Sequence, residues 1–287
     1  MEGFFRLDSS WLIPAISATF LGSLILTIAS LYLYYYNREQ FLLFWVSSWF
    51  VNSCRYLLSL ILVFHELDIV LIGNQICAMV AGLLLVIGSA KMVHKSIPKV
   101  FYYILGALVP WTILSIILEL SFMLVTFPTF TYLAIIYIWT GFALYSYREI
   151  DLLNRTFLGI IFLLWGLHKA DYPFLRTVEW FAPIGFLFSA ICEISVALAL
   201  IFVFFQILKK DLMGLLVEIE DNLKKYNYTL DQIKNPLFVI AGYAELEDNE
   251  KIIEQVNSIN ETLKYLEDSW ISSERALKRI KRTYRDI

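Results

Sequence analysis

The side chains with the most distinctive potential for chemistry lie close together at Asp231, Gln232 and Asn235, directly before Pro236. An aspartate carboxylate is a weaker nucleophile near neutral pH than a neutral imidazole, and a glutamine cannot act as a base. An amide can still orient a nucleophilic water molecule. These three side chains therefore predict binding rather than covalent catalysis. Gln232 or Asn235 could still position water for a weak hydrolytic reaction.

A second set of polar side chains lies inside or beside long apolar segments: Arg55, Glu193, His168, Asp171, Tyr172 and Arg176. Ionisable groups in such segments are costly and normally face the interior of a helix bundle, where they find a partner. Arg55 and Glu193 are candidates for one interhelical ion pair, which serves either as a structural clamp or as a ligand or proton site. His168 and Asp171 are three residues apart and so share a helix face, as a hydrogen-bonded corner or as part of a stimulus site.

The composition explains why these groups must be carried by membrane helices. Hydrophobic residues make up 59% of the 287 residues and charged residues 17%, with a mean hydropathy of +0.66. A soluble domain of this length is far less apolar, so the chain is predicted to be a membrane protein. The net charge of -3 argues against a nucleic-acid partner. Its three histidines are predicted to lie too far apart to form a ligand pair, so neither a metal nor another cofactor is expected.

Seven segments are long and apolar enough to cross the hydrocarbon core, which takes about 20 residues. Short polar stretches separate them, and the boundary between the fourth and fifth is placed at Pro128. We therefore expect a sensor domain over residues 1–208. The seven predicted spans are Trp11–Tyr36, Phe41–Phe64, Ile69–Val93, Val100–Leu118, Phe127–Tyr147, Thr156–Tyr172 and Trp180–Leu208.

The distribution of lysine and arginine predicts the orientation of these spans in a plasma membrane. Eight basic residues fall on one side, counting from Arg38 to Lys210, and three fall on the other, namely Arg6, Lys169 and Arg176. Basic residues accumulate in cytoplasmic loops. The N-terminus is therefore expected outside and the part of the chain after Leu208 in the cytoplasm, where it can also approach membrane lipid.

From Leu212 onward the apolar residues alternate at spacings of four and three, which is the pattern of a heptad seam. The pattern breaks once, at residues 247–250, and then resumes to the end of the sequence. Two helices of similar length joined by about four residues must fold antiparallel. Because Phe238, Val239 and Ile253 widen the apolar stripe, residues 209–287 are predicted to be a hairpin that dimerises as a four-helix bundle.

The stretch Leu230–Ile240 resembles the H-box of sensor histidine kinases, the helix that carries a phosphorylated histidine five residues before a proline. The resemblance places Asp231 at the phosphoacceptor position, Gln232 at its acidic neighbour and Asn235 with Pro236 at the conserved end of the motif. Residues 165–185, which include Trp165, His168 and Pro183, are similar to the seven-helix sensor region of some signalling proteins. The fold class implied is an all-α membrane protein with seven transmembrane helices and a cytoplasmic antiparallel hairpin.

The same resemblance implies that the chemistry of the family has been lost. Histidine is absent after His168, so no hairpin residue can replace the phosphoacceptor, and no Gly-rich nucleotide-binding region follows the hairpin. We therefore expect a non-enzymatic protein that signals by docking a histidine kinase or a response regulator, with weak phosphatase activity through Gln232 or Asn235 left open. The expected assembly is a homodimer formed through the hairpin.

Two alternatives remain open on the sequence. The first is a truncated or inactivated sensor histidine kinase. In that case the histidine was replaced by Asp231 and the ATP-binding region was lost, either naturally or by engineering. The second is a transporter or channel with a cytoplasmic dimerisation stalk. Transporters often contain paired, broken spans that repeat across two halves, and this sequence does not show such a repeat.

Overall fold

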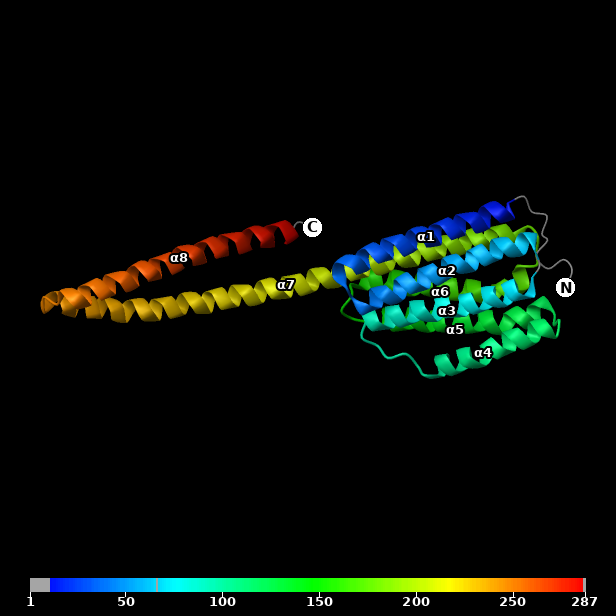
Figure 1. Cartoon of the computed structure of the whole chain (residues 1–287), viewed down its shortest axis with the longest axis horizontal. Coiled ribbons are helices and arrows are strands. Elements are labelled where there is room, and N and C mark those ends of the chain that lie inside the picture. The colour runs from blue at the N-terminus through cyan, green and yellow to red at the C-terminus, as the bar shows by residue number, and fades with distance from the viewer. Residues whose placement is uncertain (1–10, 66, 286–287) are drawn as a thin grey trace. The chain divides into compact units, whose positions relative to one another are not determined.

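The computed structural model describes residues 11–65 and 67–285, with side chains described as far as Lys278 (Figure 1). Within these residues the protein is all-helical, with eight helices and no strand. The prediction of an all-α protein is therefore confirmed. The helices are α1 (Leu12–Asn37), α2 (Gln40–Phe64), α3 (Asp68–Met92), α4 (Val100–Ile117), α5 (Phe122–Tyr145), α6 (Leu152–Leu175), α7 (Phe181–Leu246) and α8 (Glu250–Arg285).

The chain divides into two compact units, Met1–Phe205 and Gln206–Ile287, and α7 contributes to both. In the first unit, α2 packs between α1 and α3, α5 packs against α3 and α6, and α4 contacts α3 and α5. The first part of α7 joins α1 and α2 in an apolar cluster that contains Ile16, Tyr56 and Phe186. The helices of this unit run along one another as a bundle (Figure 1).

Among the residues that the structure describes, six helices are long and apolar enough to cross a membrane: α1, α2, α3, α4, α5 and α7. This confirms a multi-pass membrane protein in coarse outline. The sixth predicted span is also a helix, α6, but it is not among the six apolar ones, because it carries Arg155, His168, Lys169 and Asp171. His168 and Lys169 are buried inside the bundle, whereas Arg155 and Asp171 are half-buried.

Two prolines do not end helices as the sequence suggested. Pro128 was expected to mark the start of the fifth span, but α5 already begins at Phe122. The break lies earlier, where Glu119 adopts a left-handed conformation with a φ of 53° just after α4. Pro173 was expected to end the sixth span, but α6 continues to Leu175. So close to the end of a helix, a proline removes only one of the last intrahelical hydrogen bonds.

Close packing of α5 against α6 depends on paired glycines. A side-chain carbon added at Gly141 would lie 3.0 Å from the backbone oxygen of Gly159, and one added at Gly159 would lie 3.3 Å from the backbone oxygen of Gly141. Because the obstacle in both directions is backbone, it cannot move aside as a side chain can. Small residues at such crossings let membrane helices approach closely and gain van der Waals contact.

Replacing Gly141 with alanine should therefore destabilise the bundle by about 1–3 kcal/mol, the usual cost of overpacking a tightly packed interface. Thermal unfolding of the purified protein in detergent measures the change. Gly106→Ala is the matched control, because nothing lies within 4 Å of the added carbon there. We expect Gly106→Ala to leave stability unchanged or to raise it slightly, since alanine is the better helix former. Equal melting temperatures for the two variants would contradict the close approach.

The second unit is an antiparallel hairpin of the last part of α7 and α8 (Figure 1). Its core joins Leu230 and Leu237 of α7 to Val256 and Leu263 of α8. The indole of Trp270 also donates a hydrogen bond of 3.0 Å to the backbone oxygen of Leu223. Lys234 of α7 also forms an ion pair with Glu267 of α8. The chain turns between the two helices at Asp248, which has a left-handed backbone conformation.

Candidate functional site

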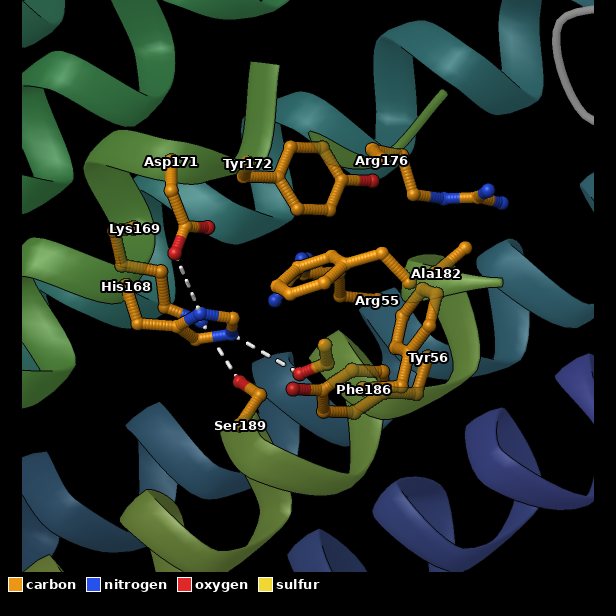
Figure 2. A pocket seen from close by; sticks show the side chains of 12 residues that line it. Arg55, Tyr56, His168, Lys169, Asp171, Tyr172, Arg176, Ala182, Phe186 and Ser189 are labelled. Atoms are coloured by element: carbon orange, nitrogen blue, oxygen red, sulfur yellow. Dashed lines mark hydrogen bonds and ion pairs between the residues drawn. The ribbon is translucent and has the colours of Figure 1, made fainter. Parts of the chain in front are cut away.

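A layer of buried polar side chains lies in the first unit, near the end of α6 and the start of α7 (Figure 2). It surrounds a cavity of about 20 Å³, which is large enough for one or two water-sized groups. Three helices, α2, α6 and α7, supply its walls. The lining residues are Arg55, Tyr56, His168, Lys169, Asp171, Tyr172, Arg176, Phe181, Ala182, Gly185, Phe186 and Ser189.

His168 connects α6 to α7 at one side of this cavity. Its Nε2 lies 3.0 Å from the backbone oxygen of Gly185, and its Nδ1 lies 3.3 Å from Oδ2 of Asp171 (Figure 2). A carbonyl oxygen only accepts hydrogen bonds, so Nε2 must carry a proton and donate to Gly185. Nδ1 can then donate to Asp171 only when the ring is a doubly protonated imidazolium, because a neutral ring with its proton on Nε2 presents a lone pair to the carboxylate. The contact itself is the one that the shared helix face of His168 and Asp171 suggested.

A chain of hydrogen bonds runs through the layer from α6 to α2. The ammonium group of Lys169 donates to the hydroxyl of Ser189 at 3.0 Å, and this hydroxyl donates to Oε1 of Glu193 at 3.5 Å. The hydroxyl of Tyr56 donates to the same carboxylate oxygen. Glu193 has only 2% of its surface exposed, so these contacts replace the water that a carboxylate otherwise requires.

Arg55 is also deeply buried, with 4% of its surface exposed. Its guanidinium carbon lies 5.0 Å from the centre of the Tyr56 ring and 5.9 Å from that of Phe130, which are cation–π distances. Its Nε is buried and has no hydrogen-bond partner among the described residues. The side-chain amide of Asn74 in α3 donates to the backbone oxygen of Arg55 at 2.9 Å and holds this part of α2 in place.

Aromatic rings support the remaining polar groups of the layer. Tyr172 stacks on Phe130 of α5, with ring centres 3.9 Å apart, so the end of α6 is anchored to α5. The guanidinium carbon of Arg176 lies 5.5 Å from the centre of the Phe186 ring in α7. Arg176 is buried, although it lies just beyond the end of α6.

The structure brings together Arg55, His168, Asp171, Tyr172 and Arg176 around one cavity, and it places Glu193 directly behind this cavity. In the described part of the chain, however, Arg55 and Glu193 do not form the direct ion pair considered from the sequence. Glu193 instead accepts its hydrogen bonds from Tyr56 and Ser189.

Sequence reasoning missed Lys169, which had been counted among the loop charges. This residue is 4% exposed and contacts Ser189 rather than solvent. Lys169 follows Trp165 by four residues and so lies on the same helix face, which could have indicated burial. In the structure its ammonium nitrogen lies 5.2 Å from the centre of the Trp165 ring. Tyr56 and Ser189 were also missed, because hydroxyl groups are common in membrane helices and carry no charge pattern.

The residues described in the structure offer no group of three His, Cys, Asp or Glu side chains arranged to hold a metal ion. What the arrangement can do chemically is bind, orient and exchange hydrogen bonds between α2, α6 and α7.

The residues of the H-box-like stretch lie in the second unit, on the surface of α7. Asp231, Gln232, Asn235 and Pro236 are all exposed, whereas the flanking Leu230 and Leu237 are buried in the hairpin core. Pro236 lies inside the helix and has no N–H group to donate to the carbonyl of Gln232, four residues earlier. This stretch therefore presents a carboxylate, two amides and a free backbone acceptor to solvent.

Comparisons of this chain with models of protein families, with curated proteins and with solved structures find no match.

Proposed function

We propose that this protein is a membrane receptor-like signalling protein, in which a polar layer in the helix bundle receives a stimulus and the hairpin passes it on by docking a partner. The partner class is a histidine kinase or the receiver domain of a response regulator. The protein would act without catalysing phosphoryl transfer itself, because Asp231 occupies the position at which the resemblance expects histidine.

The observation that carries this proposal is that one helix, α7, contains residues of both the polar layer and the docking surface. This single helix of 66 residues contributes Gly185, Ser189 and Glu193 to the polar layer and also bears Asp231 and Asn235 on its exposed surface. A change in the hydrogen bonds at Ser189 or Glu193 therefore acts on the same helix that presents the docking residues. Helix movements of one or two ångströms are a common way of transmitting such changes.

The proposal treats α6 as a seventh membrane-spanning helix. Its polar residues His168 and Lys169 are buried against α7, so the surface that remains for lipid is apolar, as at Leu164 and Leu167. Burial of Lys169 and Arg176 also removes both from the loop charges of one side. The remaining asymmetry favours the orientation proposed from the sequence, with the hairpin in the cytoplasm.

In the hairpin, the proposed docking surface consists of Asp231, Gln232, Asn235 and Pro236. Large apolar side chains next to it are also exposed, with Phe238 at 70% and Val239 at 58%. Exposed apolar patches of this kind usually mark contact with another protein. We assign this apolar patch to the homodimer and the polar group beside it to the signalling partner.

The docking surface can be tested by a double substitution, Gln232→Ala with Asn235→Ala, in the full-length protein in nanodiscs. Both amides are exposed, so the hairpin should fold normally while the affinity for a receiver domain or kinase falls about tenfold or more, because polar contacts at an interface centre are lost. Binding is measured by surface plasmon resonance against purified receiver and kinase proteins of the same organism.

Asn257→Ala is the matched control, since Asn257 is an exposed amide on α8. This control should bind like the unmodified protein. If the unmodified protein binds neither receivers nor kinases, docking is wrong and the hairpin is a dimerisation stalk. If a receiver binds and loses its phosphoryl group faster, and the double substitution removes this acceleration, the weak phosphatase role of the two amides is supported.

A further inference from the structure

His168 connects α6 to α7 through both nitrogens of its ring (Figure 2). Nε2 faces the backbone oxygen of Gly185 at 3.0 Å, and Nδ1 faces a carboxylate oxygen of Asp171 at 3.3 Å. A carbonyl oxygen and an ionised carboxylate only accept hydrogen bonds, so both nitrogens must donate. Only the imidazolium form carries a proton on each nitrogen. The connection seen in the structure is therefore complete only when His168 is protonated.

A neutral His168 ring has one proton for these two acceptors. A hydrogen bond to an ionised carboxylate is about twice as strong as one to a neutral carbonyl, so the proton stays on Nδ1 and faces Asp171. Nε2 then presents a lone pair to the backbone oxygen of Gly185, and two acceptors at 3.0 Å repel each other. Loss of one proton thus removes the hydrogen bond to α7 and keeps the one within α6.

The ring of His168 has little freedom to turn away from this repulsion. It packs against the ring of Phe188 in α7, with ring centres 4.8 Å apart, and its side chain is only 9% exposed. Gly185 lets the ring come this close to the backbone of α7, since a side-chain carbon added there would lie 3.7 Å from Cε1 of His168. The repulsion is therefore relieved by a movement of α7 relative to α6.

Charged neighbours of both signs act on a proton held by His168. Lys169 repels such a proton and Asp171 attracts it, so neither protonation state of the ring is excluded by its surroundings. From α5, the ring of Phe130 stacks on Tyr172 and contributes no titratable group. The other charged or titratable side chains around the cavity are Arg55 and Tyr56 of α2, Tyr172 and Arg176 at the end of α6, and Glu193 of α7.

We propose that His168 is a proton-binding site that ties α6 to α7 when it is protonated and releases α7 when it is neutral. Protons reach the ring beside Asp171, whose side chain is 35% exposed. Gly185 lies one helical turn before Ser189, which donates to Glu193, so movement at Gly185 also acts on this hydrogen-bonded chain. A change of pH would then be the stimulus of the receptor proposed above, and the site rests on that proposal for its meaning as a signal.

The protonation state and tautomer of His168 can be measured by ¹⁵N NMR spectroscopy of the full-length protein in nanodiscs, labelled at histidine. The sequence has three histidines, and the two others, His65 and His94, are exposed. Replacing both with asparagine leaves the signals of His168 alone. Between about pH 4 and 9, which covers most histidines in folded proteins, we expect imidazolium at the acidic end and a neutral ring with its proton on Nδ1 at the basic end.

Asp171→Asn distinguishes the proposed switch from an ordinary titration. An amide can donate to Nδ1, so the neutral ring should carry its proton on Nε2 and keep the hydrogen bond to Gly185. This variant should therefore show the opposite neutral tautomer at the basic end. Asp68→Asn is the matched control, because it makes the same change at an exposed carboxylate in the first turn of α3. It should behave like the unmodified protein.

Transmission to the hairpin is measured by the surface plasmon resonance experiment described above, at pH values below and above the midpoint of the titration. In the unmodified protein, the affinity for the receiver or kinase should differ about tenfold between the two pH values, as expected for the loss of one hydrogen bond. The difference should be much smaller in Asp171→Asn, which keeps the hydrogen bond to α7. Any difference that remains in this variant belongs to the partner.

The proton site is overturned if His168 keeps one protonation state over the whole range, or if its neutral form carries the proton on Nε2 in the unmodified protein. Equal pH dependence of docking in the unmodified protein and Asp171→Asn would overturn the role of the proton as stimulus. The NMR measurement needs no partner, so it decides on the site even if docking fails. Absence of docking would instead overturn the function proposed for the hairpin.

Discussion

Replacing Glu193 with alanine should lower the free energy of unfolding of the bundle by about 3–5 kcal/mol, the largest loss that we expect from a single side chain. The substitution removes the acceptor that satisfies Tyr56 and Ser189. It also leaves the buried cations Lys169 and Arg55 with less negative charge around them. Loss of one partner from a buried charged network costs more than the network contributes as a whole, because the remaining charge cannot return to water.

Thermal or denaturant unfolding in detergent measures this effect, and Glu193→Gln separates its two components. Glutamine keeps an acceptor for Tyr56 and removes the negative charge. The free energy of unfolding of Glu193→Gln should therefore lie between that of the unmodified protein and that of Glu193→Ala. The control is Glu39→Ala, an exposed glutamate just before α2 whose side chain makes no capping hydrogen bond. It should change stability by less than about 0.5 kcal/mol. A Glu193→Ala protein as stable as this control would show that the polar layer does not hold the bundle together.

Placing a charge at Phe238 should dissociate the dimer proposed for the hairpin. In Phe238→Glu, a carboxylate replaces a ring that is 70% exposed in a single chain and that we expect to be covered by a second copy. An aromatic residue at the centre of an interface typically contributes about 2–4 kcal/mol, so the dissociation constant should rise about 30- to 1,000-fold. Mass photometry in detergent at several concentrations measures the ratio of dimer to monomer.

Tyr228→Glu is the matched control, because Tyr228 is also an aromatic residue of α7, is 66% exposed and lies about 15 Å before Phe238 along the helix. It should leave the dimer intact. Neither substitution touches the apolar contacts between Leu237 and Leu263 inside the hairpin, so the helical content by circular dichroism should stay the same. A dimer that persists in Phe238→Glu would move the interface away from this patch.

Much of the fold was predictable because it depends on local patterns. Long apolar segments and heptad spacing each report one helix at a time, and the structure has a helix in every segment where one was expected. The exceptions occur where one residue was overinterpreted. Pro173 lies in the last turn of α6, where a proline costs little, and Pro128 lies in the second turn of α5, where it removes one hydrogen bond without ending the helix.

The site was less predictable because it depends on contacts between helices. The sequence identified the intramembrane charges, since these are rare, but not which of them meet. Lys169 was interpreted as a loop residue because counting rules treat a lysine near a span end as exposed. Its burial follows from Ser189 of α7, 20 residues away along the chain, which gives the ammonium group a hydrogen-bond acceptor. No local pattern contains that information.

The unbroken course of α7 also has a consequence for how the hairpin folds. Starting a helix is unfavourable because several residues must be fixed before the first hydrogen bond forms, whereas each added residue then extends it readily. The last part of α7 extends a helix that begins at Phe181, inside the bundle, and so needs no nucleus of its own. Only α8 must be nucleated anew, after the turn at Asp248 and Asn249. A peptide of residues 206–287 would lack this template and should be less helical than the same residues in the full chain.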